Sequence, residues 1–399
     1  MPSHTTTTTT GYGGRLKNAI AGFFFGILLV GGAFYLLSWN ESRALKTANS
    51  IDMAEKVVIT VPANEVNPTN DGKLVHFNGL MQTDDTVSDR EFGVSRQGVL
   101  RLIRDVEMYQ WVEDKQTRTR DNVGGGQTTE TTYSYSKQWS SSQASMEGPR
   151  RSEYQNPSMR FKGDSFVARN VTVGAFTIPR DLHSNLGSPE LIPTSDVQLA
   201  SRWVQQFRSS GEWFSTSSNA SDPQVGDYRL RFKLVPESNG SFMAAQNRNT
   251  LGQYQTVEDR SVYESEDGLL SAAEMISNMR TQNAMMTWGL RFGGFLMMFI
   301  GFAMMLGPIK AVAMLLPFLG NIIGFGTGLI AFVLAFCLSL ITIAVAWLAV
   351  RPLLGGGLIV LGIAALILPR FIGKKDNVPQ PATGDFGTPG RTPPPPPGG

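Results

Sequence analysis

Apolar residues are segregated into two parts of this 399-residue chain. One run covers residues 18–39, and a nearly continuous apolar block covers residues 289–372, with a long polar stretch between them. A helix of about 20 apolar residues crosses a hydrocarbon core of ~30 Å. This segregation predicts an integral membrane protein, although the net charge of +2 for the whole chain is one that a water-soluble protein also shows.

Proline, glycine and charged residues divide the second apolar block into three segments. The first run is longer than the core of about 7–15 apolar residues in a cleaved signal peptide, so we expect an uncleaved anchor. The sequence therefore predicts a multi-pass α-helical membrane protein with four spans. The spans cover residues 18–39, 289–307, 322–350 and 353–372, and a cytoplasmic or interfacial loop covers residues 308–321.

Positive residues beside the spans predict their orientation, because Lys and Arg are enriched in cytoplasmic loops. With four spans both termini share one side, and more Lys and Arg residues fall on that side. Trp39, Trp288 and Trp347 lie at the other ends of their spans and are candidate interface anchors. We expect cytoplasmic termini and an extracytoplasmic domain of residues 40–288, inserted between spans 1 and 2. This domain would be periplasmic at a bacterial inner membrane, or lumenal in the endoplasmic reticulum and inner nuclear membrane of a eukaryote.

The expected spans contain no charged residue deep inside them. Pumps and proton-coupled transporters usually need such groups at membrane depth, so the spans favour packing over conduction. Small residues recur at a four-residue spacing that lets helix backbones approach closely, although glycine is also simply common in membrane helices. The candidate helix-packing positions are Gly22, Gly26, Gly320, Gly324 and Gly328.

The polar stretch of residues 40–288 shows the alternation typical of a β-rich α+β domain. In residues 228–235, Arg229, Arg231 and Lys233 point to one face and apolar residues point to the other. This basic face is a candidate contact for a membrane surface or a partner, since each Lys or Arg near anionic lipid is attracted by about 1 kcal/mol. The alternative is a solvated strand face or a charged sheet edge.

The segments at the borders of the domain and of the chain carry their own patterns. Ser271 followed by Glu274 is the pattern of a capping box, which predicts a juxtamembrane helix at the end of the domain. Residues 1–17 contain a threonine run, and residues 373–399 form a proline-rich tail. We expect both ends to be disordered cytoplasmic segments.

The sequence contains no pattern that indicates a catalytic, cofactor-binding or metal-binding residue. The three histidines, His4, His76 and His183, lack zinc-ligand spacing, and the single cysteine, Cys337, lies in the third span. No nucleotide-binding glycine loop or nucleophile motif is present. We predict no enzyme activity, no cofactor and no nucleic-acid partner. An enzyme or ligand sensor in the domain is a less favoured alternative, because carboxylates can meet in space without a motif.

Several strings along the chain carry a resemblance to a known family. They are WNESRALKTA at residues 39–48, GKLVHFNG at 72–79, VEMYQWVE at 106–113, TTYSYSKQW at 131–139, PQVGDYRLRF at 223–232, MMTWGLR at 285–291 and WLAVRPL at 347–353. In these strings and in their order the chain resembles the transmembrane protein 43 family. The threonine-rich start and the proline-rich tail depart from the family and suggest a distant, bacterial member.

The resemblance implies four spans, a large domain on the outer or lumenal side and no catalytic residues. Animal members of the family are organisers of the endoplasmic reticulum and inner nuclear membrane that self-associate and bind lamins and emerin-like proteins. We predict a non-enzymatic membrane scaffold whose partners are the lipid bilayer, further copies of itself and other membrane proteins. The alternative is an accessory subunit or a pore-like membrane protein.

Overall fold

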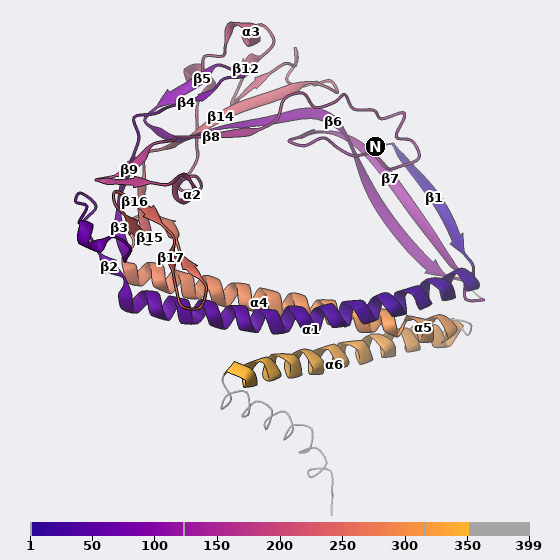
Figure 1. Cartoon of the computed structure of the whole chain (residues 1–399). Coiled ribbons are helices and arrows are strands. Elements are labelled where there is room, and N and C mark those ends of the chain that lie inside the picture. The colour runs from indigo at the N-terminus through magenta and orange to yellow at the C-terminus, as the bar shows by residue number, and fades with distance from the viewer. Residues whose placement is uncertain (1, 123, 314–316, 351–399) are drawn as a thin grey trace, which may run out of the picture.

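The computed structural model describes residues 2–122, 124–313 and 317–350. Figure 1 shows an arch of β-structure above two long helices that lie side by side, and a third long helix on the side of this pair away from the arch. The long helices are α1 (Tyr12–Val57), α4 (Ala272–Met305) and α6 (Pro317–Val350). The short helices are α2 (Arg180–His183), α3 (Ser201–Val204) and α5 (Gly307–Ala313).

Helix α1 is one continuous helix of 46 residues. Its first half is apolar, and its second half continues past residue 39, the predicted end of the first span, into the β-rich domain. There Ile51 and Ala54 are buried against Met275 and Ile276 of α4 and against the adjoining sheet. The predicted boundary between a membrane span and a domain therefore falls inside a helix that belongs to both.

Helix α4 begins at the capping box that the sequence predicts. The Ser271 side chain accepts a hydrogen bond from the Glu274 backbone N–H at 3.3 Å, and the Glu274 carboxylate accepts one from the Ser271 backbone N–H at 2.7 Å. These reciprocal bonds satisfy donors that a helix start leaves open. The helix then runs without interruption through the juxtamembrane segment and the second apolar segment.

The larger sheet has eight strands, with six of them in the order β1-β7-β6-β14-β13-β12. Strand β11 pairs with β14 and strand β8 pairs with β6. The strands are β1 (Ser3–Thr10), β6 (Val99–Asp121), β7 (Gln127–Ser140), β8 (Asp164–Val167), β11 (Glu190–Leu191), β12 (Arg208–Ser210), β13 (Trp213–Ser215) and β14 (Tyr228–Pro236).

The second sheet has seven strands in the order β19-β15-β16-β10-β9-β3-β2, with β15 also paired to β3. Its strands are β2 (Ile59–Thr60), β3 (Leu74–Gln82), β9 (Val171–Val173), β10 (Phe176–Ile178), β15 (Asn239–Asn247), β16 (Thr250–Gly252) and β19 (Glu264–Asp267). Two small hairpins complete the domain, β4 (Thr86–Asp89) with β5 (Val94–Gln97) and β17 (Tyr254–Gln255) with β18 (Ser261–Val262).

The main hydrophobic core lies between the two sheets and is rich in aromatic side chains. Phe77 of β3 stacks on Phe176 of β10, with ring centroids 4.3 Å apart. Phe92 lies beside Trp203 and Phe207, at centroid distances of 5.4 Å and 5.6 Å. The predicted β-rich α+β domain is therefore present and is packed around its own core.

One part of the larger sheet extends beyond this core, and we call it the ribbon. It consists of β1, β7 and residues 108–121 of β6, which are paired along their whole length. Figure 1 shows the ribbon as the descending arm of the arch, which reaches the N-terminal end of α1.

The threonine run lies in this ribbon, so the prediction that residues 1–17 are disordered is wrong. Every residue of β1 from Ser3 to Thr10 has a register partner in β7. The physical reason is that β-branched threonine suits a strand and that β7 offers an open edge. The pairing also conflicts with the predicted separation of residues 1–17 from residues 40–288 by a bilayer, since strands that share hydrogen bonds lie on one side of a membrane.

Three helical segments of the described residues are long and apolar enough to cross a membrane. They are α1, α4 and Phe325–Trp347 within α6, and they correspond to the first three predicted spans. The predicted loop at residues 308–321 contains the short helix α5. The fourth predicted span, residues 353–372, and the tail, residues 373–399, lie outside the described residues.

Candidate functional site

A network of polar side chains joins the three long helices, and we call it the helix junction. Glu41 of α1 accepts two hydrogen bonds from Arg291 of α4, both at 2.7 Å. It accepts a third, at 2.5 Å, from the indole N–H of Trp347 of α6. The Glu41 side chain is only 3% exposed and that of Arg291 15%. Because a bidentate arginine–carboxylate pair is directional, this contact fixes all three helices relative to one another.

The junction continues along α1 and α4 through amide and hydroxyl groups. Arg43 donates hydrogen bonds to Asn283 at 3.2 Å and to the Thr287 hydroxyl at 2.9 Å. Asn40 donates to the Thr287 carbonyl oxygen at 3.1 Å, and Asn283 donates to that of Ala44 at 3.0 Å. Buried polar groups are costly without partners, so these bonds make the close contact of α1 with α4 at this level specific.

A cavity of about 260 Å³ opens beside the junction. Its walls come from all three long helices, and Glu41 and Arg291 are the charged residues in it. Both oxygens of Glu41 already accept hydrogen bonds from Arg291 and Trp347. The carboxylate is therefore engaged in holding the helices together. The cavity is lined by Glu41, Ala44, Leu45, Ala48, Ala284, Thr287, Trp288, Arg291, Ala346 and Trp347.

The three predicted interface tryptophans have different surroundings. Trp39 is 44% exposed and Trp288 is 67% exposed. The Arg291 guanidinium lies over the Trp288 ring, 4.8 Å from its centroid. Trp347 instead turns its N–H inward to Glu41. The prediction of interface anchoring stays open for all three, and for Trp347 the structure adds a role in the junction.

The predicted packing glycines also differ from one another in their surroundings. A Cβ on Gly26 would lie 2.5 Å from the carbonyl oxygen of Gly301 in α4, so these two glycines mark a very close approach of the two helix backbones. Gly22 has only the Met304 side chain near it, at 3.6 Å, and Gly328 has no atom within 4 Å of such a Cβ. Side-chain surroundings at Gly320 and Gly324 lie outside the described residues.

The basic face predicted on β14 is present, but its charges are compensated by the neighbouring strand. Arg229 pairs with Glu107 at 2.5 Å, and Arg231 and Lys233 pair with Asp105 at 3.0 Å and 2.7 Å. Burial acts in the opposite direction, but the hydrogen bonds from Lys233 and Arg231 lower the pKa of Asp105 and keep it ionised.

Aromatic rings add to this compensation. The Arg229 and Arg231 guanidinium groups both lie 4.4 Å from the centroid of the Trp213 ring, at cation–π distance. This face is therefore a self-neutralised network of charges and rings. Its predicted contact with lipid or with a partner stays a prediction.

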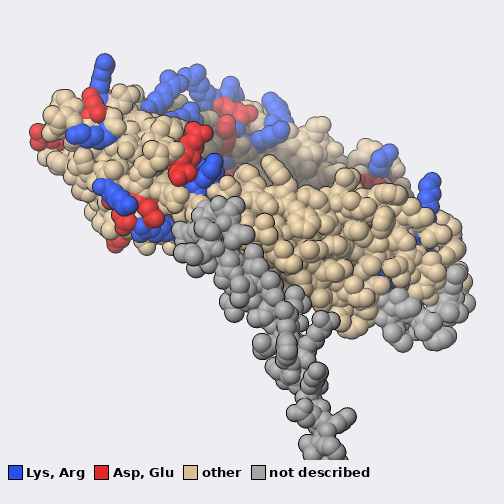
Figure 2. All heavy atoms as spheres, turned by 60° about the horizontal axis from the view of Figure 1, so that its bottom comes forward, with Lys and Arg blue, Asp and Glu red and all other residues tan. Residues whose placement is uncertain are grey.

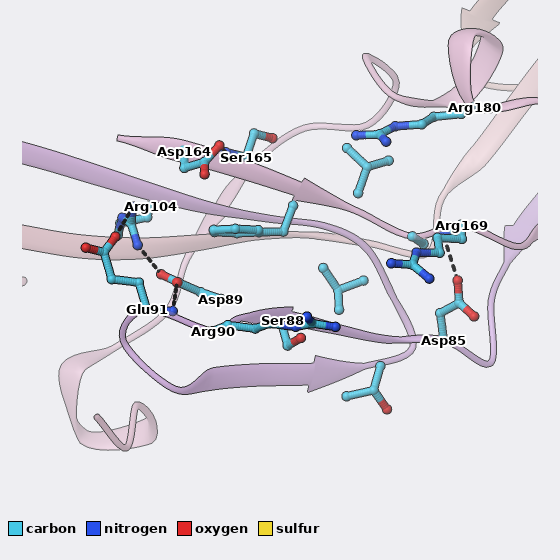
Figure 3. A pocket seen from close by; sticks show the side chains of 15 residues that line it. Asp85, Ser88, Asp89, Arg90, Glu91, Arg104, Asp164, Ser165, Arg169 and Arg180 are labelled. Atoms are coloured by element: carbon cyan, nitrogen blue, oxygen red, sulfur yellow. Dashed lines mark hydrogen bonds and ion pairs between the residues drawn. The ribbon is translucent and has the colours of Figure 1, made fainter. Parts of the chain in front are cut away.

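A polar cleft of about 580 Å³ lies at the β4–β5 hairpin, and Figure 3 shows it from close by. Arg104 spans one end of it, paired with Asp89 at 2.7 Å and with Glu91 at 2.8 Å. The Arg104 and Asp89 side chains are 5% and 0% exposed. The Asp89 carboxylate also accepts the Glu91 backbone N–H at 2.9 Å, so it holds the turn as well as the arginine.

At the other end of the cleft, Asp85 is held by backbone donors (Figure 3). It accepts hydrogen bonds from the backbone N–H groups of Asn170 at 2.8 Å and Arg169 at 2.6 Å. These bonds, that from Asn170 first, lower the pKa of Asp85. Arg180 lines the same cleft. The carboxylates of Asp85 and Asp89 are therefore committed to structural contacts at the two ends of the cleft.

The two histidines of the domain are buried. His76 lies 3.0 Å through Nε2 from the carbonyl oxygen of Leu270, and burial lowers its pKa. His183 is 1% exposed, and burial lowers its pKa to about 4. Within the described residues no group of three or more histidine, cysteine, aspartate or glutamate side chains is placed to hold a metal ion.

Sequence reasoning did not find the helix junction. The sequence predicted Trp39, Trp288 and Trp347 as interface anchors and indicated no partner for any of them. The available signal was the presence of Asn40 and Glu41 directly after an apolar run, inside one of the strings that carry the resemblance. The sequence does not indicate which residues of the other two helices contact Asn40 and Glu41.

The fold and the junction define a class: an integral membrane protein in which long apolar helices continue into a β-rich domain. The model of the family described as "Transmembrane protein 43" matches residues 108–352. The human Transmembrane protein 43 is 32% identical over 387 residues, which cover 94% of this chain and 94% of that protein. The rat protein is 32% identical over 369 residues, covering 89% and 91%. The Drosophila melanogaster homolog is 26% identical over 363 residues, covering 86% and 92%.

This chain therefore belongs to the transmembrane protein 43 family, as its strings predict. No solved structure matches it.

Proposed function

We propose that this chain is a non-enzymatic scaffold that self-associates in the membrane and organises membrane structure. The observation that carries the proposal is the contrast between its internal and external surfaces. The buried and half-buried charges of β6, β14 and the helix junction are paired with each other, whereas large apolar side chains of the long helices face outward. Contiguous exposed apolar surface marks contact with a membrane or with other proteins.

Two features support self-association. Strand β1 is the end strand of its sheet, so its outer edge has unpaired backbone donors and acceptors within the described residues. Such an edge is a template for pairing with a further strand. On α6, Gly328 leaves open space where a second helix could approach closely.

The paired charges also support a non-enzymatic role. Glu41, Asp89 and Asp105 each hold arginine or lysine side chains in place. A catalytic acid or base instead needs a pKa near the working pH and access to a substrate. The alternative of a pore has little support in α6, where Ser339 and Thr342 donate to carbonyl oxygens of their own helix.

The experiment is to measure the oligomeric state of the full-length protein in mild detergent, with chemical crosslinking in native membranes alongside. We expect a species larger than the monomer. Gly328→Leu should reduce its fraction, because the larger side chain would prevent close approach of a second helix. Gly326→Leu is the matched control, since Gly326 also has no neighbour within 4 Å but lies about 200° around the helix from Gly328. A strictly monomeric wild-type protein would refute self-association.

A further inference from the structure

Three arginines line the polar cleft at the β4–β5 hairpin without a partner for their charge. Arg90, Arg169 and Arg180 all belong to the lining, and all three are exposed. Among the residues that the structure describes, their guanidinium groups form no ion pair and no hydrogen bond. They come from three separate segments of the chain, and Figure 3 shows them extending into the half of the cleft that lies away from Arg104.

The carboxylates of the lining gather at the other end. Asp89 and Glu91 pair there with Arg104 at 2.7 Å and 2.8 Å, and Asp164 lies at the same end (Figure 3). Asp85 is the one acidic residue of the lining at the end with the three arginines, which therefore carries an excess of two positive charges. A cleft with an excess of one sign of charge concentrates ions of the opposite sign.

The backbone that carries these arginines is held in place, although their side chains reach into water. Asp85 accepts the backbone N–H of Arg169 at 2.6 Å, which fixes the link between β8 and β9. Asp89 accepts a backbone N–H of the turn that carries Arg90, at 2.9 Å. Arg180 begins α2, whose last two residues are buried. Because the three segments are already positioned, a ligand that joins them has less ordering entropy to overcome.

The cleft opens to water and not to hydrocarbon. It lies in the arch, at β4, β5 and β8, whereas the long helices lie at the opposite side of the molecule (Figure 1). Figure 2 shows a broad uncharged surface over those helices, with the charged side chains gathered away from it. A ligand for the arginines therefore comes from the aqueous phase or from the headgroups of a facing membrane.

We propose that the arginine-lined end of this cleft binds the phosphoryl group of a phosphate monoester. A guanidinium group can donate two parallel hydrogen bonds to a phosphate, which makes arginine suited to this recognition. A phosphate monoester carries a charge of about −1.5 to −2 near pH 7, which matches the excess of positive charge at this end. Ser88 lines the cleft two residues before Arg90 and is exposed, so its hydroxyl is a further donor.

The cleft is large enough for the organic part of such an ester. Its volume of about 580 Å³ lies within the range of about 300–1,000 Å³ that is usual for small-molecule sites, and a phosphate fills only part of it. Away from the three arginines the lining includes the exposed polar residues Asp164 and Ser165. These side chains can form hydrogen bonds with hydroxyl groups, which favours the ester of a hydroxylated alcohol, such as glycerol.

Isothermal titration calorimetry of the full-length protein in mild detergent, at constant ionic strength, tests a soluble ligand. The probes are inorganic phosphate and glycerol 3-phosphate, with glycerol and acetate as controls. We expect saturable binding of glycerol 3-phosphate that is tighter than that of phosphate, and no saturable binding of either control. Arg169→Gln and Arg180→Gln should each weaken binding about tenfold or more, because each removes charged hydrogen bonds to the phosphoryl group.

Arg208→Gln is the matched control for these variants. It removes the same charge from an exposed position of β12, outside the cleft, and should leave the Kd unchanged within about twofold, since a distant surface charge acts weakly in salt. Arg169→Lys keeps the charge but not the fork of donors, so its Kd should lie between those of the wild type and of Arg169→Gln. Thermal unfolding of each variant should match the wild type, because the three guanidinium groups are exposed and unpaired.

A vesicle experiment tests the same chemistry in a lipid headgroup. The full-length protein in phosphatidylcholine nanodiscs is sedimented with sucrose-loaded vesicles of phosphatidylcholine, with or without phosphatidic acid, whose headgroup is a phosphate monoester of glycerol. Co-sedimentation that requires phosphatidic acid and is lost in Arg169→Gln but not in Arg208→Gln would identify a headgroup ligand. Binding of glycerol 3-phosphate alone would identify a soluble one.

Two results would overturn the proposal: no binding of any phosphate monoester in either experiment, or equal weakening by Arg208→Gln and the cleft variants. Neither depends on self-association. A monomeric protein that binds glycerol 3-phosphate through Arg169 would keep this site and refute the scaffold, and an oligomer that binds no phosphate monoester would do the reverse.

Discussion

Two buried arginine–carboxylate pairs hold two different parts of this molecule. Arg104 and Asp89 lie within the β-rich domain, close together in the chain, with side chains 5% and 0% exposed. Arg291 and Glu41 lie in the helix junction, 250 residues apart in sequence, with side chains 15% and 3% exposed. The first pair secures a hairpin against its own sheet, whereas the second connects separate helices.

The difference shows that a buried ion pair has a different role in the domain and in the helical layer. In the domain the pair is surrounded by a core that also has aromatic support, since Arg104 lies 4.8 Å over the Phe92 ring. In the helical layer, neighbouring side chains are mostly apolar and small, so packing alone gives little preference for one helix register over another. A directional polar contact supplies that preference there.

Removing Arg104 should have the largest effect. Arg104→Met leaves the Asp89 carboxylate buried without its partner, and breaking a buried pair costs about 3–5 kcal/mol of the free energy of unfolding. Thermal unfolding of the purified protein in detergent measures this change. The matched control is Arg118→Met on the exposed part of β6, which should change stability by no more than about 0.5 kcal/mol. Equal effects of the two substitutions would contradict the structural role given to Arg104.

Arg291→Met tests the second pair and should cost somewhat less, about 3 kcal/mol, because the pair is less completely buried and Trp347 still donates to Glu41. We expect α6 to loosen, so protease digestion in detergent should cut near the junction sooner than in the wild type. Lys310→Met, at an exposed position of the same layer, is the control. A protein that keeps wild-type protease resistance would show that helix packing alone sets the arrangement.

As the pH falls, the buried His183 should lower the stability of the domain before the ion pairs break. The folded-state pKa of about 4 lies below the usual value of 6.5, so the unfolded state takes up the proton first. The contribution of the neutral histidine to the free energy of unfolding is fully present above about pH 6.5. It is lost as the pH falls toward 4, at up to about 1.4 kcal/mol per pH unit. Unfolding measured between pH 7 and 4 should show a smaller slope in His183→Phe. His4→Gln, outside the core, should leave the slope unchanged.

The smallest effect is expected at the partly exposed pair between Arg15 and Asp121, whose side chains are 13% and 46% exposed. Arg15→Ala should change global stability by about 1 kcal/mol or less. It should nevertheless increase hydrogen exchange in β1 and at the ribbon tip, because the helix start is no longer held there. Unchanged exchange in β1 would show that strand pairing alone fastens the N-terminal segment.

Much of the helical part could be predicted from the sequence, because hydrophobicity and capping are local properties. The apolar run after Asn18 and the Ser271–Glu274 capping box each gave a helix that the structure contains. The alternation around Arg229 gave the strand β14 and its two faces. The partners of those residues could not be predicted, since Asp105 and Glu107 lie on a strand more than a hundred residues away and no local pattern specifies the register.

The sequence by itself determined the membrane class, the family, the start of α4 and the absence of recognisable catalytic motifs, because each is written in composition or in short strings. Only the tertiary structure decided that the threonine run is a strand, that Glu41 joins three helices and that the two ends of α1 are fastened to one β-structure. The physical reason is that side-chain periodicity encodes which face is apolar, while strand pairing and ion pairs depend on which distant backbone edge or charge remains available.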